Sequence, residues 1–537
     1  MGSCRSNWAV NRLVADCSDA AVTASPRHPS RMLAAIRSAA LLGIDAYDVT
    51  VEVDAAPGLP QWTMVGLPLG AVKESRERVG AALVNAGFTL PPRRVTVNLA
   101  PADIRKDGTA FDLPIALGVL VATDQLDPGA VADRLFVGEL GLDGSVRGIR
   151  GALSVARRAA CCNVRELVLP WQNVEEAGRV SALPISAPRD LRSLVDELRD
   201  GTLSIASRSP SKSIAKHDEP DFAEVVGQET AKRALEVAAA GGHNLLMVGP
   251  PGGGKTMLAR RLPGILPELT EEESLEVIAI HSVAGILTSE SLSSGTRPFR
   301  APHHSISSAG LIGGGSAPRP GEVSLAHNGV LFLDEMLEFP RSVLDGLRQP
   351  MEDGSVVISR AAMSVRYPAK FTLIGATNPC PCGRFGDPSG KCICPQPEID
   401  RYARRMSGPL ADRIDMHVTV GSVSLKALSA DQSGESTRSI RDRVSRARTA
   451  QGKRYARLRG VTCNAHAAGR WLDIGGEVGH DARTMLQNAA IALSLSARGY
   501  HRVLKVARTI ADLDVSRVVS ETHVAEALRY RPSAATP

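Results

Sequence analysis

"NLLMVGPPGGGKTMLARRL", residues 244–262, is the stretch that decides the fold. It consists of an apolar run from Leu245 to Val248, a loop of prolines and glycines, and a helical pattern from Met257 to Leu262. Four positions match the pattern G-x-x-x-x-G-K-[ST]: Gly249, Gly254, Lys255 and Thr256. A strand, a loop and a helix in this order predict a P-loop within an α/β sheet.

The composition of the loop suits phosphate binding. Glycine lets the backbone approach the phosphates, because a Cβ atom would block it. Backbone N–H groups and the helix N-terminus would bind the anion, Lys255 would reach the β- and γ-phosphates, and Thr256 would ligate Mg²⁺. The predicted nucleotide-binding set is Gly249, Pro250, Pro251, Gly252, Gly253, Gly254, Lys255, Thr256 and Asp334.

Two later apolar runs also end in polar side chains. "NGVLFLDEMLEF" (328–339) runs into Asp334 and Glu335, as a buried parallel strand does at the edge where ligands bind. Asp334 is predicted to hold Mg²⁺, and Glu335 to orient and deprotonate the attacking water. "KFTLIGATNP" (370–379) ends in Asn378, which would position this water; an Asn-Pro turn is the structural alternative. Together these stretches predict an ATPase.

The composition predicts a soluble, folded, multidomain protein. The chain has 537 residues, 43% of them hydrophobic, and a formal net charge of +6, which permits a polyanionic partner. Its start lacks the pattern of a signal peptide, and its nine cysteines form no evenly spread disulfide framework. The longest uncharged apolar stretch, 113–122, is shorter than the roughly 20 residues of a membrane span. We therefore expect a cytoplasmic protein.

Changes in composition divide the chain. The N-terminal stretch lacks periodicity and is interpreted as a flexible extension, or as a misassigned start with Met32 as the true one. The predicted segments are an extension (1–31), an α+β domain (32–199), a linker rich in Ser, Pro and Lys (200–220), a P-loop core with a parallel sheet and flanking helices (221–424), and a helical C-terminal domain (425–537).

Several longer motifs resemble the AAA+ ATPases of the magnesium-chelatase-like group, and most closely the ComM/YifB family. They are "VGLPLGAVKESRERVGAAL" (65–83), "DFAEVVGQETAKRALEVAAAGGHNLLMVGPPGGGKT" (221–256), "RPFRAPHHSISSAGLIGGG" (297–315), "PGEVSLAHNGVLFLDE" (320–335), "NPCPCGRFGDP" (378–388) and "SGPLADRIDMHV" (407–418). The resemblance implies a ring-forming motor, typically hexameric, associated with DNA branch migration during natural transformation.

The resemblance also implies roles for basic residues. Arg413 occupies the arginine-finger position, from which a neighbouring subunit would place a cation against the γ-phosphate; Ala411 stands nearby where the family usually has Leu. Arg498 resembles the sensor-2 arginine of the helical lid, with Arg502 as the competitor and a structural salt bridge as the alternative for either.

The segment upstream of the P-loop core resembles the Lon protease catalytic fold, with two departures. In "IRKDGTAFDLP" (104–114) Ala110 stands where the catalytic Ser would be, and in "GELGLDGSVRGIRGALS" (138–154) Leu153 replaces the general-base Lys. Without a nucleophile and its base, peptide hydrolysis has no route. We expect a non-proteolytic domain kept for assembly or partner contact.

Two segments are candidates for contact with DNA. "GSVVISRAAMSVRYPAKF" (354–371) is predicted to form a β-hairpin that presents Arg360, Arg366 and Lys370 to a phosphate backbone; a solvated charged hairpin is the alternative. The glycine-rich stretch 297–320 is the second candidate, and it carries Arg297, Arg300 and Arg319. The adjacent His303 and His304 are expected to form loop hydrogen bonds rather than to ligate a metal.

"NPCPCGRFGDPSGKCICPQPE" (378–398) holds two Cys-x-Cys pairs: Cys380, Cys382, Cys392 and Cys394. If the turn-rich loop between them folds back, four thiolates would surround one Zn²⁺ and staple a loop without a core. Structural zinc sites usually use Cys-x₂₋₄-Cys, so reduced cysteines that pack a loop behind Asn378 are the alternative.

Three hypotheses about function follow. The first is an ATP-hydrolysing motor that translocates on DNA, with helicase or branch-migration output. The second is a protein-remodelling or metal-chelatase-type ATPase with a protein partner. The third is a regulatory scaffold that uses ATP only to assemble.

Overall fold

The computed structural model describes residues 33–180, 183–206, 220–288, 291–292, 295–315, 318–360, 363–386, 392–421, 434–458, 460–467 and 477–531. The described residues form two compact units, those up to 206 together with 278–292, and those of 220–277 together with 295–531. Helix α10 (Glu271–Ala284) contributes to both units, because the division falls after Val277. The predicted extension 1–31, most of the predicted linker and the predicted boundary at 424 lie outside the described residues.

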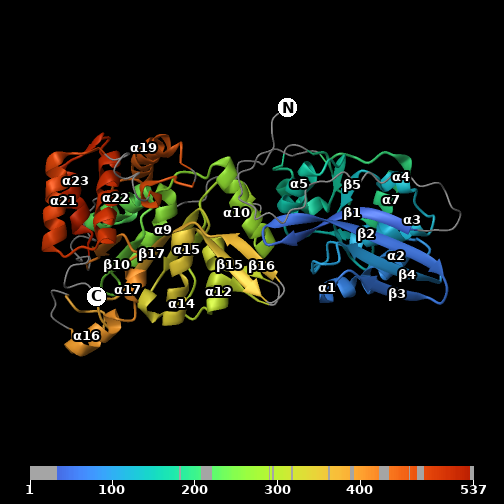
Figure 1. Cartoon of the computed structure of the whole chain (residues 1–537), viewed down its shortest axis with the longest axis horizontal. Coiled ribbons are helices and arrows are strands. Elements are labelled where there is room, and N and C mark those ends of the chain that lie inside the picture. The colour runs from blue at the N-terminus through green and yellow to red at the C-terminus, as the bar shows by residue number, and fades with distance from the viewer. Residues whose placement is uncertain are drawn as a thin grey trace. The chain divides into compact units, whose positions relative to one another are not determined.

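The first unit contains a seven-stranded mixed sheet. Its strands are β1 (Leu33–Leu42), β2 (Asp45–Pro57), β3 (Gln61–Val65), β4 (Arg93–Ala100), β5 (Arg134–Phe136), β8 (Glu166–Val168) and β9 (Ile185–Ser186). They are ordered β3-β4-β2-β1-β5-β8-β9, and Figure 1 shows the long strands β1, β2 and β4 in this unit. β2 pairs antiparallel with β1 and β4, whereas the remaining neighbours are parallel. Ile36 lies opposite Val51, and both are fully buried. Buried and less buried residues alternate along β2, so one face of the sheet packs against the core.

Helices cover this core. All eleven residues of α3 are buried, which explains its uninterrupted apolar sequence "DLPIALGVLVA". Glu74 separates α1 (Gly70–Lys73) from α2 (Ser75–Asn85), because it is the C-cap of the first helix and the N-cap of the second. The other elements of the unit are α1 (Gly70–Lys73), α2 (Ser75–Asn85), α3 (Asp112–Ala122), α4 (Pro128–Val131), β6 (Glu139–Leu140), β7 (Val146–Arg147), α5 (Ala152–Cys161), η1 (Trp171–Asn173), α6 (Val174–Ala177) and α7 (Leu191–Asp200).

The second unit contains a five-stranded parallel sheet, as the sequence predicts. Its strands are β10 (Leu245–Val248), β11 (Phe299–Arg300), β14 (Gly329–Leu333), β17 (Phe371–Thr377) and β18 (Met416–Thr419). They are ordered β11-β14-β17-β10-β18, and all neighbours are parallel. Every residue of β10 and β14 is buried, as expected for apolar strands covered on both faces. The parallel arrangement places the residues that follow β10, β14 and β17 at one edge of the sheet.

Short helices and two hairpins surround this sheet. The helices are η2 (Phe222–Glu224), α8 (Glu229–Gly241), α9 (Lys255–Ile265), α12 (Ser308–Ile312), α13 (Glu322–Leu325), η3 (Met336–Glu338), α14 (Arg341–Gly346), α15 (Arg348–Asp353), α16 (Gln396–Ala403) and α17 (Gly408–Ala411). The hairpins are β12 (Gly313–Gly314) with β13 (Arg319–Pro320), and β15 (Ser355–Arg360) with β16 (Met363–Pro368).

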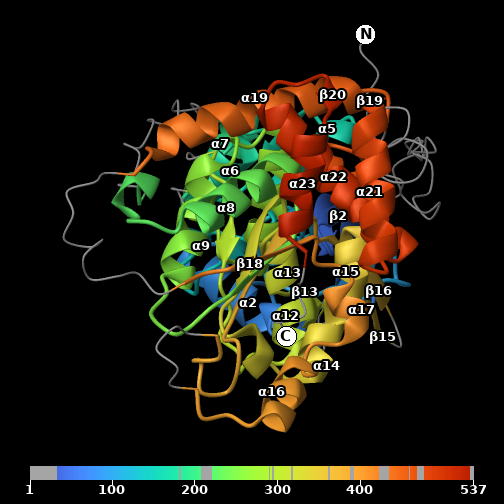
Figure 2. The same ribbon diagram turned by 90° about the vertical axis from the view of Figure 1, so that its left-hand side faces the viewer.

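The end of the described chain is mostly helical. It comprises α19 (Thr437–Tyr455), η4 (Asn464–His466), β19 (Glu477–Val478), α21 (His480–Ala492), α22 (Ala497–Leu513), β20 (Val518–Val519) and α23 (Glu521–Arg529). α19 packs against α8 and α9, and Figure 2 shows α21, α22 and α23 close together. Their apolar residues join those of the parallel sheet in one core. Among the described helices, none is long and apolar enough to cross a membrane.

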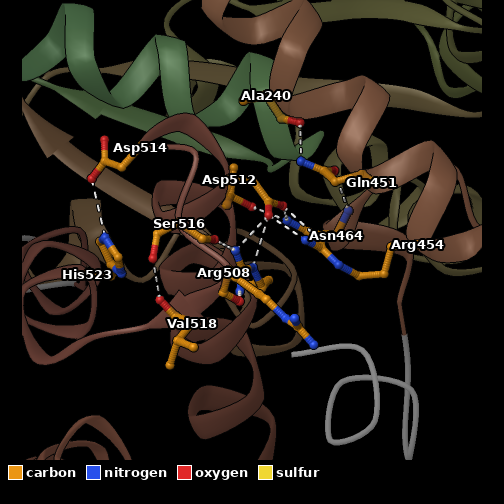
Figure 3. Close-up of polar contacts among 12 residues, drawn as sticks. Ala240, Gln451, Arg454, Asn464, Arg508, Asp512, Asp514, Ser516, Val518 and His523 are labelled. Atoms are coloured by element: carbon orange, nitrogen blue, oxygen red, sulfur yellow. Dashed lines mark hydrogen bonds and ion pairs between the residues drawn. The ribbon is translucent and has the colours of Figure 1, made fainter. Parts of the chain in front are cut away.

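A buried polar network fixes these helices (Figure 3). Asp512 of α22 is 5% exposed and accepts hydrogen bonds from Arg454 Nη1 at 2.9 Å, Arg508 Nε at 3.0 Å and Asn464 Nδ2 at 2.9 Å. Gln451 of α19 donates to the carbonyl oxygen of Ala240 in α8 at 3.0 Å. The network therefore joins α19, η4 and α22, and the Gln451 contact attaches them to α8.

Candidate nucleotide-binding site

The P-loop lies between the carboxyl end of β10 and the start of α9. The N–H of Gly249 donates to Thr377 of the neighbouring strand at 3.1 Å. A Cβ atom on Gly249 would lie 2.1 Å from the carbonyl oxygen of Val420, so only glycine fits there. Gly252 and Gly254 adopt φ values of +77° and +84°, in the region that favours glycine. The predicted loop glycines are thus explained by close approach and by backbone conformation.

Lys255 is the first residue of α9, and its ammonium group is held inside the loop. Its Nζ donates to the carbonyl oxygens of Gly249 at 2.6 Å and Pro250 at 2.9 Å, and to Asn378 Oδ1 at 3.2 Å. Burial lowers the pKa of Lys255, while the nearby carboxylates of Asp334 and Glu335 act in the opposite direction. The structure therefore brings the predicted lysine and Asn378 into direct contact.

The next residue, Thr256, contacts the acidic end of β14. Thr256 Oγ1 donates to Asp334 Oδ2 at 2.6 Å. A hydroxyl and a carboxylate at this distance can share a hydration shell around Mg²⁺, which prefers oxygen ligands. The chemistry of these donors fits the predicted magnesium site.

Glu335 follows Asp334 in a left-handed backbone conformation, with φ of 49°. Its N–H donates to Asp334 Oδ1 at 3.0 Å, and its side chain is 57% exposed. Positive φ is uncommon for residues other than glycine and is often found at functional sites. The turn separates the two carboxylates, so that Asp334 faces Thr256 while Glu335 extends into solvent.

A contact between a histidine and Glu335 was not predicted from the sequence. His304 Nδ1 lies 3.5 Å from Glu335 Oε2, and its ring stacks on that of His303 with the centroids 4.0 Å apart. His303 Nδ1 is hydrogen-bonded to Ser305 Oγ at 2.9 Å, a loop contact as expected. The contact with Glu335 could be found only from the strand order, which places β11 beside β14.

Gln228 is a second residue that the motif analysis missed. It has a φ of 60°, and its Nε2 donates to the carbonyl oxygens of Gly253 at 3.2 Å and Gly421 at 2.6 Å. The side chain therefore bridges the P-loop and the segment that follows β18. Gln228 lies in the motif "VGQE" (226–229) before α8, and this motif was the sequence feature from which the contact could have been predicted.

Arg413 lies at the opposite edge of the sheet. Asn244 directly precedes β10, and its Nδ2 donates to the carbonyl oxygen of Arg413 at 3.0 Å. The P-loop leaves the other end of β10. Arg413 therefore stands beside the amino ends of the parallel strands, and the sheet separates it from Lys255 of the same chain.

Arg413 shares a cavity of about 320 Å³ with the sensor-2 candidates. Its cationic lining residues are Arg413, Arg498, Arg502 and Lys505, and its acidic ones are Glu352, Asp412 and Asp415. His466 and His501 also line it. Burial lowers the pKa of Arg502 and of Lys505. The sequence identified three of the four cations but gave no sign that they gather in one cavity.

The contacts of the cavity's arginines differ from one residue to the next. Arg413 forms an ion pair with Glu352, but its buried Nε has no hydrogen-bond partner among the described residues. Arg502 Nε lies 3.9 Å from Asp415 Oδ1. This ion pair is the contact that the salt-bridge alternative for Arg502 requires. Arg498, in contrast, is exposed on the first turn of α22.

The predicted hairpin is present as β15 and β16. Arg366 lies opposite Val357 on the exposed face, and its Nε donates to Ser355 Oγ at 3.0 Å. Arg360 is the last residue of β15, next to the turn, and its side chain is outside the described part. Lys370 follows the hairpin at its base and is exposed. The structure thus places Arg366 and Lys370 on the solvent-facing surface.

Two of the three arginines in the glycine-rich candidate form ion pairs within the fold. Arg297 is bound to Glu273 Oε2 at 2.8 Å and to the carbonyl oxygen of Asn328 at 2.7 Å. Arg300 forms two contacts with Glu322, at 2.6 and 2.8 Å. These side chains are satisfied within the fold, since each pairs with a carboxylate. Arg319 of β13 is exposed.

The four cysteines of the loop after β17 come together. Sγ of Cys380 lies 3.4 Å from that of Cys382 and 3.8 Å from that of Cys392, and Cys382 and Cys392 are 3.7 Å apart. With Cys394, all four sulfur atoms lie within 4.8 Å of one another. A tetrahedral zinc site with Zn–S bonds of about 2.3 Å requires S–S separations of about 3.8 Å. The donor set therefore fits Zn²⁺.

Backbone N–H groups surround these sulfurs. The N–H of Phe385 donates to Cys380 Sγ at 3.3 Å. Hydrogen bonds from the N–H groups of Ile393 and Arg384 lower the pKa of Cys382 to about 6. These donors favour the thiolate of Cys382, which is the form that binds metal. Backbone hydrogen bonds also lower the pKa of Cys392 and of Cys394, but burial and contacts with the other cysteines outweigh them and raise it.

Together, the parallel sheet, the P-loop and the acidic end of the neighbouring strand define the nucleotide-binding core of an AAA+ ATPase. Family models agree with this class. The model described as "Magnesium chelatase, subunit ChlI" matches residues 221–428, "Subunit ChlI of Mg-chelatase" matches 51–173, and "Magnesium chelatase, subunit ChlI C-terminal" matches 434–531.

Comparison with curated relatives identifies the family to which the chain belongs within this class of ATPases. The chain is 43% identical over 505 residues to "Competence protein ComM" of Haemophilus influenzae. This alignment covers 93% of this chain and 97% of the relative. It is 41% identical over 507 residues to "Uncharacterized protein YifB" of Escherichia coli, with the same coverage. The "Magnesium-chelatase 38 kDa subunit" of Rhodobacter capsulatus is 30% identical over 33% of this chain and 56% of the relative. The chain belongs to the ComM/YifB family of magnesium-chelatase-like ATPases.

Proposed function

We propose that this protein is a cytoplasmic, ATP-hydrolysing ring motor that acts on DNA, with helicase or branch-migration output in recombination during natural transformation. The observation that carries the motor assignment is the contact of Lys255 with Asn378 at 3.2 Å beside the pair formed by Thr256 and Asp334 at 2.6 Å. The DNA assignment is supported by the relative named a competence protein and by the basic hairpin.

The site residues divide the work of ATP hydrolysis. Lys255 and the N–H groups of the P-loop bind the phosphates, and Thr256 with Asp334 would hold Mg²⁺, which when bound neutralises phosphate charge. Glu335 accepts the proton of the attacking water, because its carboxylate is exposed and adjacent to the metal-binding aspartate. Asn378 orients the same water from the neighbouring strand.

A homo-oligomer, by family resemblance a hexamer, would complete the site. Arg413 and Arg498 face the sheet edge opposite their own P-loop, so they would act on nucleotide bound by an adjacent copy of the chain. Four cations against three carboxylates in the cavity give a net positive lining for the phosphates. Hydrolysis would then depend on assembly.

DNA would contact the β15–β16 hairpin through Arg360, Arg366 and Lys370. Cations on an exposed hairpin can follow a phosphate backbone without reading bases. The four-cysteine cluster would bind Zn²⁺, since its sulfur atoms already have the required spacing. The first unit would be a non-catalytic counterpart of the Lon protease fold, because Ala110 and Leu153 offer neither a nucleophile nor a base.

The matches to magnesium-chelatase subunit models favour a second candidate function. These models together match three parts of the chain, so a protein-remodelling or chelatase-type ATPase with a protein partner is the alternative. Dependence of turnover on DNA distinguishes the two.

Steady-state ATP hydrolysis without DNA, with single-stranded DNA, with duplex and with a three-way branched substrate tests the proposal. We expect stimulation by DNA, strongest on the branched form, and loss of that stimulation in Arg366→Ala with basal turnover retained. Equal turnover with all four additions would favour the protein-remodelling function instead.

A further inference from the structure

We infer that the four-cysteine cluster acts as a metal-dependent clamp, which holds Asn378 and the P-loop in the arrangement needed for ATP hydrolysis. The inference rests on the proposed function, because it assumes that the site hydrolyses ATP. It adds a role to the cysteines, which would position the catalytic groups without touching the nucleotide themselves.

The first arm of the clamp, residues 378–383, begins at the catalytic asparagine. Cys380 lies two residues after Asn378 and is completely buried, although the loop around it is polar. Asn378 Oδ1 accepts from Lys255 Nζ at 3.2 Å. A ligand held at Cys380 therefore limits the movement of Asn378, because the chain between them is only one proline long.

The same arm touches the P-loop. Gly383 has φ of +76°, and a Cβ atom on it would lie 2.6 Å from Pro251 Cδ and 3.8 Å from Asn378 Cγ. The N–H of Gly383 donates to the carbonyl oxygen of Cys380 at 2.9 Å, which closes the turn between the first two cysteines. The turn thus rests directly on the P-loop.

The second arm of the clamp, residues 392–405, contacts the turn that follows the general base Glu335. Cys392 and Cys394 precede α16, whose N-cap is Pro395. A hydrogen bond joins Tyr402 of α16 to Thr377 at the end of β17. Just after α16, Arg405 Nη1 contacts Glu338 Oε2 at 2.7 Å, in the turn that follows Glu335. The cluster therefore connects the P-loop, Asn378 and the Glu335 turn.

Three of the four cysteines lie near the surface of their loop. Cys382, Cys392 and Cys394 are only partly buried, and the adjacent Ile393 is 86% exposed. Weak hydrogen bonds between sulfur atoms join Cys380, Cys382 and Cys392 at separations below 4 Å, and Zn²⁺ would replace these contacts with stronger Zn–S bonds. Loss of the metal would release both arms together.

Three variants of the full chain test the clamp. Cys382→Ser/Cys394→Ser removes two ligands. Gly383→Ala keeps all four ligands but places a methyl group against Pro251. Cys161→Ser, an exposed cysteine in the first unit, is the matched control. Zinc content, amide hydrogen exchange of residues 249–256 and 378–383, binding of fluorescent ADP and ATP turnover are measured for each.

We expect wild type and control to hold about one zinc per chain. The double variant should lose zinc, exchange faster in both segments, and turn over ATP at least about tenfold more slowly, because misplaced catalytic groups cost rate steeply. Gly383→Ala should retain zinc yet show slower turnover. The inference is overturned if wild type binds no zinc, or if the zinc-free variant keeps wild-type exchange and turnover. If wild type hydrolyses no ATP, the proposed function fails, while zinc content and exchange still decide whether the clamp exists.

Discussion

Glu335 and Lys255 illustrate how neighbouring side chains determine chemistry at this site. Lys255 is buried among carbonyl oxygens, and its pKa is lowered by that burial. Glu335 is more than half exposed, and His304 Nδ1 lies 3.5 Å from its carboxylate. An exposed carboxylate can accept a proton from water, and a buried ammonium group can bind phosphate without solvent competition.

Glu335→Gln should separate binding from hydrolysis. The amide keeps the shape of the side chain but cannot accept a proton, so ATP binding should remain within about threefold of wild type while turnover falls by about 10²–10⁴-fold. Fluorescent-nucleotide titration and phosphate release measure the two quantities. Wild-type turnover in this variant would show that another group is the base.

The acid sensitivity of the second unit should depend on His417. Burial, and then the charges of Arg531 and Arg502, lower the pKa of His417 to about 4, while Asp415 opposes them. Because the ordinary pKa is near 6.5, the folded state prefers the neutral ring. Stability is therefore complete above pH 6.5 and is lost as the pH falls toward 4, by on the order of 3 kcal/mol. His417→Gln should show a smaller loss over this range in denaturant titrations, and an unchanged loss would contradict the assignment.

Strands were predicted better than helix contacts and loops. β10 coincides with the predicted apolar run Leu245–Val248, and β14 and β17 end one residue before Asp334 and Asn378, because strands buried on both faces leave a plain sequence pattern. The contact between His304 and Glu335 and the cavity around Arg413 depend on strand order and helix packing, which residue spacing does not encode. The ion pairs of Arg297 and Arg300 were not predicted for the same reason, since their carboxylate partners lie elsewhere in the sequence.

The buried network of α19 and α22 should contribute strongly to stability. Asp512→Ala would leave Arg454 and Arg508 without their shared carboxylate, and breaking a buried charge network by removing one partner costs about 3–5 kcal/mol. Asp514→Ala is the control, because Asp514 is 49% exposed and should cost below about 1 kcal/mol. Urea unfolding measures both. Equal effects of the two variants would show that the network is not a major source of stability.

In the assembled protein, nucleotide and arginines would come from different copies of the chain. The P-loop and Arg413 stand at opposite ends of β10, which no rotation of a side chain can bridge. The proposed ring would account for this opposite placement, because a site completed by a neighbouring copy links hydrolysis to assembly.

Mixing two inactive variants tests this composite site most directly. Lys255→Ala lacks the P-loop cation but keeps the arginines, and Arg413→Ala has the opposite defect. We expect each alone to hydrolyse ATP at least about 10²-fold more slowly than wild type. Mixed subunits should recover measurable turnover, because some interfaces then combine an intact P-loop with an intact Arg413. Wild-type turnover by Arg413→Ala alone, or a mixture that stays inactive although the subunits exchange, would contradict the composite site.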